Sequence, residues 1–318
     1  MNPLVSVIVP TYNCAAFVAD ALDSVLSQDY SPIEVIVVDD GSTDGTRDVL
    51  VRYGERIKVF QQQNGGPAAA RNLAVSKSKG EYLAFLDGDD LWLPGKLAAQ
   101  MAYIAAHPDA RVVYGEWMVW HPDADGRFAP FNPPVPHDDF AVDDENSGWA
   151  YARLISHDCI LHIIATAIHR SVFDRVNGFD ESFRTGSDYD FWVRVSRHYP
   201  ITKLRRMVAV YRQNAASVTY TVRRENNGYR LLKRAVDTWG LRDEAGNLAD
   251  RRAVQRRLSD LAFMHGYRHF WHGDPRVALT SLWQASRHNP WRFKAYAYVG
   301  LAAVKSSLTL VQRRQSTY

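Results

Sequence analysis

The chain has 318 residues, of which 46% are hydrophobic and 23% charged, an ordinary composition for a soluble globular protein. Its two cysteines, Cys14 and Cys159, are too few and too far apart for a disulfide framework or a four-ligand zinc site. Residues 1–10 show neither a basic leader nor a small-residue cleavage site. We therefore expect a protein of the reducing cytoplasm.

Charge divides the chain into two regions. The net charge is +3, but residues 223–318 hold 18 Lys and Arg against 7 Asp and Glu, or +11, which leaves −8 for residues 1–222. The longest weakly charged stretch, residues 295–304, is too short to cross a bilayer. We predict an α/β domain over residues 1–222 and a basic helical region over residues 223–318.

The first ninety residues repeat a short apolar run, a turn cluster and an amphipathic segment, which is typical of βαβ units. The predicted strands are residues 4–9, 33–38, 57–61 and 82–86. Because these strands are apolar on both faces, we expect helices to cover both sides of a mainly parallel sheet.

The rest of the chain alternates helix and strand before it becomes helical. We predict a helix near 94–106, strands near 112–120, 161–168 and 201–211, a helix that begins near Ser187, and helices alone from Arg223 onward. Residues 121–147 are rich in Pro and Asp and lack periodicity, so we expect a mobile loop that acts as a lid or a connector.

Polar clusters follow the predicted strands. Residues 10–13 follow the first, 39–44 the second, 64–72 the third and 87–90 the fourth. Since the carboxyl ends of parallel strands share one edge of the sheet, we expect these loops to meet in one crevice. Carboxylates this dense, with no His or Cys nearby, favour Mg²⁺ or Mn²⁺ bound to phosphates. No Gly-x-Gly-x-x-Gly or Gly-Lys-Ser/Thr follows the first strand, which excludes dinucleotide and P-loop sites of the usual kind.

Five segments of the chain together resemble a known family. Residues 7–13, 37–42 and 85–90 are similar in order and spacing to family 2 glycosyltransferases of the GT-A fold, as are 178–181 with 188–194 and 211–217. The resemblance covers residues 4–217 and implies a Rossmann-like α/β sandwich with a mixed, mainly parallel sheet and a helical C-terminal extension.

The resemblance also implies roles for particular residues. Pro10 and Tyr12 would flank the nucleobase, with Thr11 and Gly88 in the same donor site. Asp40 would accept a hydrogen bond from the base or ribose, and Arg71 would contact the base or diphosphate. Asp89 would hold the metal, and Asp87 would meet the ribose or reach the metal through water. Asp188 would be the catalytic base, although Ser187 stands where the family usually has Glu.

The implied reaction is a single in-line displacement that inverts the anomeric centre. A cation would stabilise the departing nucleoside diphosphate, and a carboxylate would deprotonate the acceptor hydroxyl. The expected donors are UDP-, GDP- or dTDP-sugars, and the acceptor a sugar or a lipid-linked sugar. Polysaccharide, lipopolysaccharide or other glycoconjugate assembly would use such an enzyme, and no nucleic acid is expected.

Structural interpretations compete with these roles. Asp44 is better explained as a cap of the second helix. Ser187 to Asp190 fits a capping box, which is compatible with Asp188 as base. Pro10 and Tyr12 could simply end a strand. His157, His162 and His169 receive no role, because no metal-ligand spacing connects them.

The aromatic residues of the C-terminal region allow two interpretations. Aromatic residues in helical regions usually pack between the helices, and we expect this of most of them here. Trp291, Phe293, Tyr296 and Tyr298, however, lie among Lys and Arg residues, and 308–311 precede Arg313-Arg314. Such a mixture is typical of helices at an anionic membrane surface, so the protein could be peripheral on the inner face of the cell membrane.

Two other functions use the same residues. One is a non-catalytic module that binds a nucleotide sugar or a protein through its helices. The other is a phosphoryl-transfer enzyme with the same aspartates. A glycosyltransferase should release nucleoside diphosphate in a reaction that depends on metal and on Asp89. This release distinguishes it from the binding module and from the phosphoryl-transfer enzyme.

Overall fold

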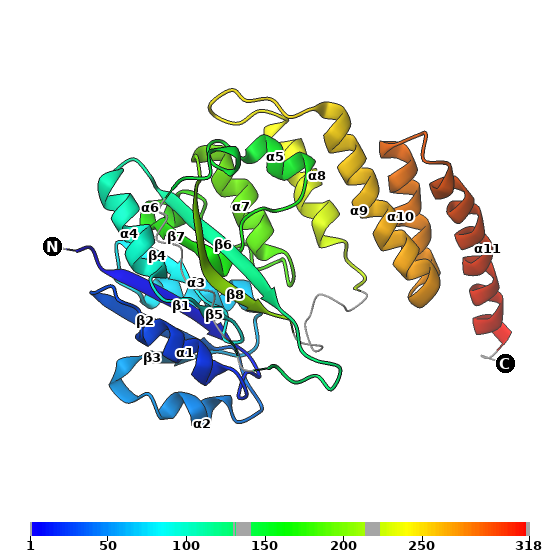
Figure 1. The fold of residues 1–318 in the computed structure, drawn as a ribbon. Coiled ribbons are helices and arrows are strands. Elements are labelled where there is room, and N and C mark those ends of the chain that lie inside the picture. Colours follow the sequence, from blue (N-terminus) through cyan, green and yellow to red (C-terminus); the bar gives the residue numbers. More distant parts are fainter. Residues whose placement is uncertain (1, 130, 132–140, 214–222, 316–318) are drawn as a thin grey trace. The chain divides into compact units, whose positions relative to one another are not determined.

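The computed structural model describes residues 2–129, 131, 141–213 and 223–315, with the backbone alone for 308–315 (Figure 1). The chain forms two compact units, Met1–Ala150 with Cys159–Ser217, and Tyr151–Asp158 with Val218–Tyr318. The segment Tyr151–Asp158 thus groups with the C-terminal helices, although the sequence analysis includes it in the first domain. Its Tyr151 hydroxyl donates to the Gly240 carbonyl at 2.9 Å, and its ring meets Trp239 edge-on.

The first unit is built on an eight-stranded sheet in the order β3-β2-β1-β4-β7-β6-β8-β5. Its strands are β1 Val5–Thr11, β2 Ile33–Asp39, β3 Lys58–Gln61, β4 Tyr82–Phe85, β5 Leu91–Trp92, β6 Val112–Trp120, β7 Thr166–His169 and β8 Thr202–Arg212. Pairing is parallel from β3 to β4 and between β6 and β8, and antiparallel around β7 and at β5. The mixed, mainly parallel sheet predicted from the sequence is confirmed.

Helices cover this sheet because its central strands are apolar on both faces. Every residue of β1 is buried, and Val7, Ile8 and Val9 have no exposed surface. α3 packs on β1 and β2, and α4 packs on β6 and β8. The helices of this unit are α1 Val18–Leu26, α2 Thr46–Val51, α3 Pro67–Lys77, α4 Lys96–Ala106, α6 Arg170–Arg175 and α7 Ser187–His198.

Three local features of the structure differ from the sequence analysis. The strand predicted over 161–168 is a 3₁₀ turn, Ile163–Ala165, followed by β7. The turn forms because the Thr166 hydroxyl donates to the Ile163 carbonyl at 2.7 Å. The short helix α5, Tyr151–Ser156, and the two-residue strand β5 were not predicted. The lid predicted over 121–147 includes 130 and 132–140, which lie outside the described residues, so it stays a prediction.

The second unit consists of α5 and four longer helices, α8 Asn227–Trp239, α9 Arg251–His272, α10 Pro275–His288 and α11 Phe293–Gln315. Asn226, Asp250 and Asp274 cap α8, α9 and α10 through their side chains. At Gly266 of α9 an added Cβ would lie 2.7 Å from Leu282 of α10, so glycine permits this close helix packing. Within the described ranges, no helix combines the length and apolar character needed to span a bilayer.

Candidate active site at the carboxyl ends of β1, β2 and β4

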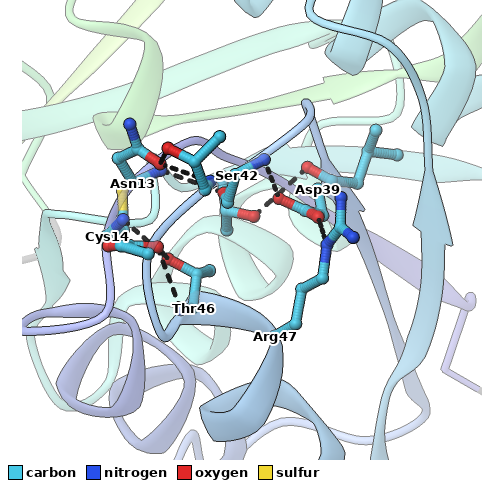
Figure 2. Close-up of polar contacts among 10 residues, drawn as sticks. Asn13, Cys14, Asp39, Ser42, Thr46 and Arg47 are labelled. Atoms are coloured by element: carbon cyan, nitrogen blue, oxygen red, sulfur yellow. Dashed lines mark hydrogen bonds and ion pairs between the residues drawn. The ribbon is translucent and has the colours of Figure 1, made fainter.

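The loops that follow β1 and β2 are joined by hydrogen bonds (Figure 2). Asn13, with a left-handed φ of 50°, donates from its backbone N–H to the Ser42 hydroxyl at 3.0 Å. Its side-chain oxygen accepts from the Thr43 N–H at 2.9 Å, and the Cys14 N–H donates to the Thr46 hydroxyl at 2.9 Å. These bonds fix the two loops against each other, while the Tyr12 side chain remains 48% exposed beside them.

Asp39 and Asp44 stabilise the loop that follows β2. The buried Asp39 carboxylate accepts from the Arg47 guanidinium at 2.6 Å and from the Ser42 N–H at 3.0 Å. Asp44 accepts from the Thr46 N–H at 3.0 Å, at the start of α2, which is the structural role that the sequence analysis gives it. Both carboxylates therefore have a structural role in fixing these loops.

Asp40 fixes the turn that leads into α3. It is 3% exposed, and its carboxylate accepts from the Gln62 side-chain amide at 2.7 Å and from the N–H groups of Gly65 and Gly66 at 2.8 Å. Gly66 has a φ of +92°, which glycine adopts without strain. The contact to base or ribose predicted for Asp40 stays a prediction, and it has to be made beside these three bonds.

The Asp-x-Asp segment lies directly against the end of β1. The Gly88 N–H donates to the Pro10 carbonyl at 3.1 Å. A Cβ at Gly88 would lie 2.7 Å from the Thr11 methyl group, so any larger residue would push the segment away. Asp87 and Asp89 are therefore placed at the mouth of the first strands, together with Pro10 and Thr11.

Arg71 connects this segment to the rest of the site. It lies on α3, is 4% exposed, and donates from Nη2 to Asp87 Oδ1 at 2.5 Å. Burial lowers the Arg71 pKa, but the charges of Asp87 and Asp188 outweigh it, so the pKa is raised. Its buried Nε has no hydrogen-bond partner in the described part of the chain. Arg71 is therefore a fixed positive charge that interacts with both Asp87 and Asp188.

The next two carboxylates are poorly accommodated as anions. Burial, and then the neighbouring Asp87, raise the pKa of Asp89 to about 6. Burial and the charges of Asp89 and Asp87 raise the pKa of Asp90 well above its usual range. Asp90 Oδ1 accepts from the Arg212 N–H at 2.7 Å, and its buried Oδ2 has no partner among the described residues. A cation would relieve this repulsion.

Asp87 and Asp89 suit a cation that arrives with its nucleotide. Among the described residues, no three His, Cys, Asp or Glu side chains are grouped to hold a metal ion by themselves. Mg²⁺ does not need such a group, because it is usually bound by one or two carboxylates together with water and substrate phosphates. The two carboxylates, one residue apart and partly exposed, fit that mode of binding.

Arg212 is a site residue to which the sequence analysis gave no role of its own. Its guanidinium is 2% exposed and lies over the rings of Phe17 and Trp120, at 4.6 and 4.9 Å. One nitrogen donates to Asp20 at 3.1 Å, and its Nε and Nη1 have no hydrogen-bond partner in the described structure. Its charge favours ionised Asp89. The Tyr211-Arg212 pair at the end of β8 was the signal that pointed to it.

Asp188 lies in the first turn of α7, where the helix dipole favours a negative charge. The predicted capping box is wrong. Gly186, at a left-handed φ of +74°, takes the N-cap position, and Ser187 is the first helical residue. Asp190 pairs with Arg194 at 2.8 Å. Because glycine adopts this left-handed conformation without strain, the helix starts one residue earlier than a Ser187 cap would require.

Asn72 joins α3 to the segment before α7. Its side-chain amide donates to the Phe179 carbonyl at 2.9 Å, and its oxygen accepts from the Phe179 N–H at 2.9 Å. Phe179 in turn stacks on Phe191 of α7, with ring centroids 4.4 Å apart. At Gly178, with a φ of +67°, a Cβ would lie 2.8 Å from the Asn72 oxygen. This clamp positions the helix that carries Asp188.

His162 also lies at this site, although the sequence analysis assigned it no role. Its ring packs on those of Trp117 and Tyr211, with centroids 4.7 and 5.1 Å away. Burial lowers its pKa, which the charges of Asp188 and Asp87 partly offset. Its buried Nδ1 makes no hydrogen bond within the described residues. No spacing in the sequence could have revealed it, because its neighbours come from three separate strands and helices.

Fold and site define a GT-A type α/β protein, and comparison with solved structures agrees. Residues 1–349 of TarS from S. aureus, crystallised with UDP-GlcNAc, have a TM-score of 0.63 at 20% identity, covering 95% of this chain and 88% of that one. The mannosyltransferase PcManGT from Pyrobaculum calidifontis, in complex with GDP-Man and Mn²⁺, has a TM-score of 0.55 at 22% identity, covering 96% and 87%.

Sequence comparisons give the family. The family model described as glycosyl transferase family 2 matches residues 6–132. An uncharacterised glycosyltransferase of Rickettsia typhi is 31% identical over 233 residues, 73% of this chain and 70% of the relative. TuaG of Bacillus subtilis, a putative teichuronic acid biosynthesis glycosyltransferase, is 48% identical over 107 residues, 32% of this chain and 42% of the relative. The chain belongs to glycosyl transferase family 2.

Other curated relatives are much longer than the matching region. Two uncharacterised glycosyltransferases, from Rickettsia felis and Rickettsia bellii, are aligned over 63% and 61% of this chain, which spans about a third of their own length.

Proposed function

We propose that the protein is a metal-dependent, inverting glycosyltransferase that moves a sugar from a nucleoside diphosphate to a hydroxyl acceptor. The proposal depends on one observation. Gly88 allows the segment with Asp87 and Asp89 to lie against the end of β1, and the buried Arg71 is paired with Asp87. The family supports the reaction class, and the bound UDP-GlcNAc and GDP-Man of the two structural neighbours support the donor class.

The donor would lie across the ends of β1, β2 and β4. The exposed Tyr12 offers a ring for the nucleobase beside Pro10 and Thr11, and Asp40 holds the adjoining turn in place. Arg71 and Arg212 supply fixed positive charge for a diphosphate, since both keep buried nitrogens without protein partners among the described residues. Mg²⁺ or Mn²⁺ at Asp89, with Asp87, would neutralise charge on the leaving diphosphate.

Asp188 is the proposed base. As the acceptor oxygen attacks the anomeric carbon, the proton of its hydroxyl passes to the Asp188 carboxylate, and the bond to the diphosphate breaks on the opposite face. One displacement of this kind inverts the anomeric centre. A positioned base contributes about 10² to 10⁴-fold to the rate. Ser187 leaves the position before the base without a second carboxylate.

The finer assignments extend the same proposal. The donor is a UDP-, GDP- or dTDP-sugar, and the acceptor a sugar or lipid-linked sugar in polysaccharide, lipopolysaccharide or other glycoconjugate assembly. The reaction takes place in the cytoplasm, at the inner face of the cell membrane where a lipid-linked acceptor would lie.

Donor hydrolysis tests the proposal without knowledge of the acceptor. The purified chain, given UDP-, GDP- and dTDP-sugars with Mn²⁺, should slowly release one nucleoside diphosphate. Asp89→Ala should lower this rate about 10²-fold or more, because the leaving group loses its cation. Asp48→Ala, at an exposed position of α2, is the matched control and should retain the rate.

Three results would contradict the proposal. Unchanged release by Asp89→Ala would remove the metal from the mechanism. Tight nucleotide-sugar binding without turnover would favour the binding module. Free phosphate or a phosphorylated product would indicate phosphoryl transfer.

A further inference from the structure

The last helix presents an apolar face that its own unit leaves uncovered. Ala295 and Ala302 are fully buried against the neighbouring helices, whereas Phe293, Tyr296, Leu301 and Val304 are 72%, 44%, 54% and 61% exposed. The exposed residues recur at helical spacing, opposite the buried alanines. We call them the outer face of α11, which lies beside α10 in Figure 1.

The segment of the chain that carries this face has charges of one sign. Asp274 is the last acidic residue of the chain, and residues 275–318 hold seven Lys and Arg and no Asp or Glu. Lys294 is exposed in the first turn of α11, next to Phe293. Trp291, 80% exposed, lies immediately before the helix. The face is therefore apolar and aromatic, with the exposed Lys294 beside it and no acidic residue in its segment of the chain.

The apolar character and the positive charge of this segment indicate which kind of surface could cover the outer face. A second copy of the chain that paired through the same face would bring an equally cationic segment against it, which like-charge repulsion opposes. An anionic lipid surface offers apolar depth for Phe293, Leu301 and Val304, an interfacial layer for Trp291 and Tyr296, and negative headgroups for the Lys and Arg residues.

We infer that the outer face of α11 binds the surface of an anionic phospholipid membrane. The helix lies along the interface, with its apolar residues among the acyl chains and Lys294 among the headgroups. This binding is independent of the chemistry proposed for the first unit, because it uses none of the residues around Asp89.

Vesicle sedimentation of the full-length chain tests the inference. The protein should pellet with phosphatidylcholine vesicles that contain phosphatidylglycerol, and about tenfold less with phosphatidylcholine alone. The triple variant Phe293→Ser, Leu301→Ser, Val304→Ser should reduce binding at least about tenfold, since several apolar side chains no longer leave water. Leu248→Ser, which changes a 58% exposed leucine elsewhere in the same unit, should bind as the wild type does.

A charge reversal gives a second, milder test. Lys294→Glu should weaken binding to anionic vesicles several-fold, whereas Arg251→Glu, at an exposed position of α9, should weaken it less. Donor hydrolysis measured without vesicles should be unchanged in every one of these variants, which separates this test from that of the proposed function.

The inference is overturned if the triple variant, with an unchanged circular dichroism spectrum, still pellets as the wild type does. It is also overturned if neutral and anionic vesicles bind equally. Self-association that the triple variant abolishes, without any vesicle binding by the wild type, would assign the outer face to a second copy instead.

Discussion

Asp89 shows how a carboxylate proposed to hold a metal can destabilise the protein that carries it. Burial and the nearby Asp87 raise its pKa to about 6, above the ordinary value of 3.8. The folded chain therefore binds this proton more tightly than the unfolded chain does. The resulting stabilisation is complete below pH 3.8 and disappears as the pH rises through 6, so at neutral pH the folded state holds an unfavourable charge.

Asp89→Asn should remove this cost together with the metal site. In EDTA at pH 7.5 we expect the variant to exceed the wild type in free energy of unfolding by about 1 to 3 kcal/mol. The difference should shrink toward pH 4, where the wild-type carboxyl is protonated. Urea unfolding at several pH values measures it, and a variant less stable than the wild type at pH 7.5 would contradict the account.

His162 titrates in the opposite sense. Its folded pKa is lowered, chiefly by burial, so the unfolded chain binds the proton more tightly and stability falls as the pH drops through 6.5. His162→Phe keeps a ring against Trp117 and Tyr211 and removes the titration. Between pH 7 and 5 its free energy of unfolding should fall less steeply than that of the wild type, by up to about 1.4 kcal/mol per pH unit.

The same variant separates structure from function. If His162 contacts substrate through its unpartnered nitrogen, His162→Phe should slow transfer about tenfold while binding of nucleoside diphosphate is unchanged. His157→Phe, at an exposed position, is the control and should change neither stability slope nor rate. Equal pH slopes in wild type and His162→Phe would show that the imidazole is not buried as described.

At the scale of elements, α3 and α7 depend on one amide. Asn72 makes two hydrogen bonds with the Phe179 backbone and a third with the Glu181 carboxylate at 2.9 Å. Through the stacked rings of Phe179 and Phe191 it holds α7, which carries Asp188, against the segment around Phe179.

Asn72→Ala should therefore reduce turnover more than donor binding. We expect kcat to fall about tenfold or more, because Asp188 is displaced, with nucleotide affinity within about twofold of wild type. The lost hydrogen bonds should cost about 1 to 3 kcal/mol of stability. Asn2→Ala removes one exposed amide bond and serves as control. A fall in nucleotide affinity with kcat unchanged would contradict this positioning role.

Sequence periodicity predicts the elements that repeat and fails where a single residue decides. The alternation of buried strands and amphipathic helices over the first ninety residues is strong enough to give β1 to β4 and the helices between them. The start of α7 depends on the left-handed Gly186, which a pattern read from Ser187 alone does not reveal. The apolar run over 161–168 reads as one strand because a 3₁₀ turn and β7 share its composition.

The same limit applies to the site. The aspartate loops follow strand ends and could be placed from the sequence, as could the segment 64–72, which carries Arg71. The bonds that occupy Asp40 and the packing of His162 depend on loops that are distant in sequence, so only the folded chain shows them.

At the scale of the whole molecule, charge is divided along the sequence: residues 1–222 have a net charge of −8, and residues 223–318 have one of +11. Such a division suits a protein in which one region binds a metal with an anionic nucleotide and another region faces an anionic surface. The carboxylates of the first region need a cation before a diphosphate can approach them, so nucleotide binding by the whole chain should depend on metal.

Thermal unfolding of the full chain measures this dependence directly. A nucleoside diphosphate that binds the folded state at about 100 times its Kd adds about 2.7 kcal/mol, which for a chain of this size corresponds to a rise in Tm of roughly 4 °C. We expect one of UDP, GDP and dTDP to produce this rise with Mn²⁺ and to lose most of it in EDTA. In Asp89→Asn the rise should be the same small value with and without Mn²⁺. The prediction is contradicted if the rise in Tm is undiminished in EDTA, or if Mn²⁺ still increases it in Asp89→Asn. Because a ligand raises Tm only when it binds the folded state, either result would mean that Asp89 does not hold the cation.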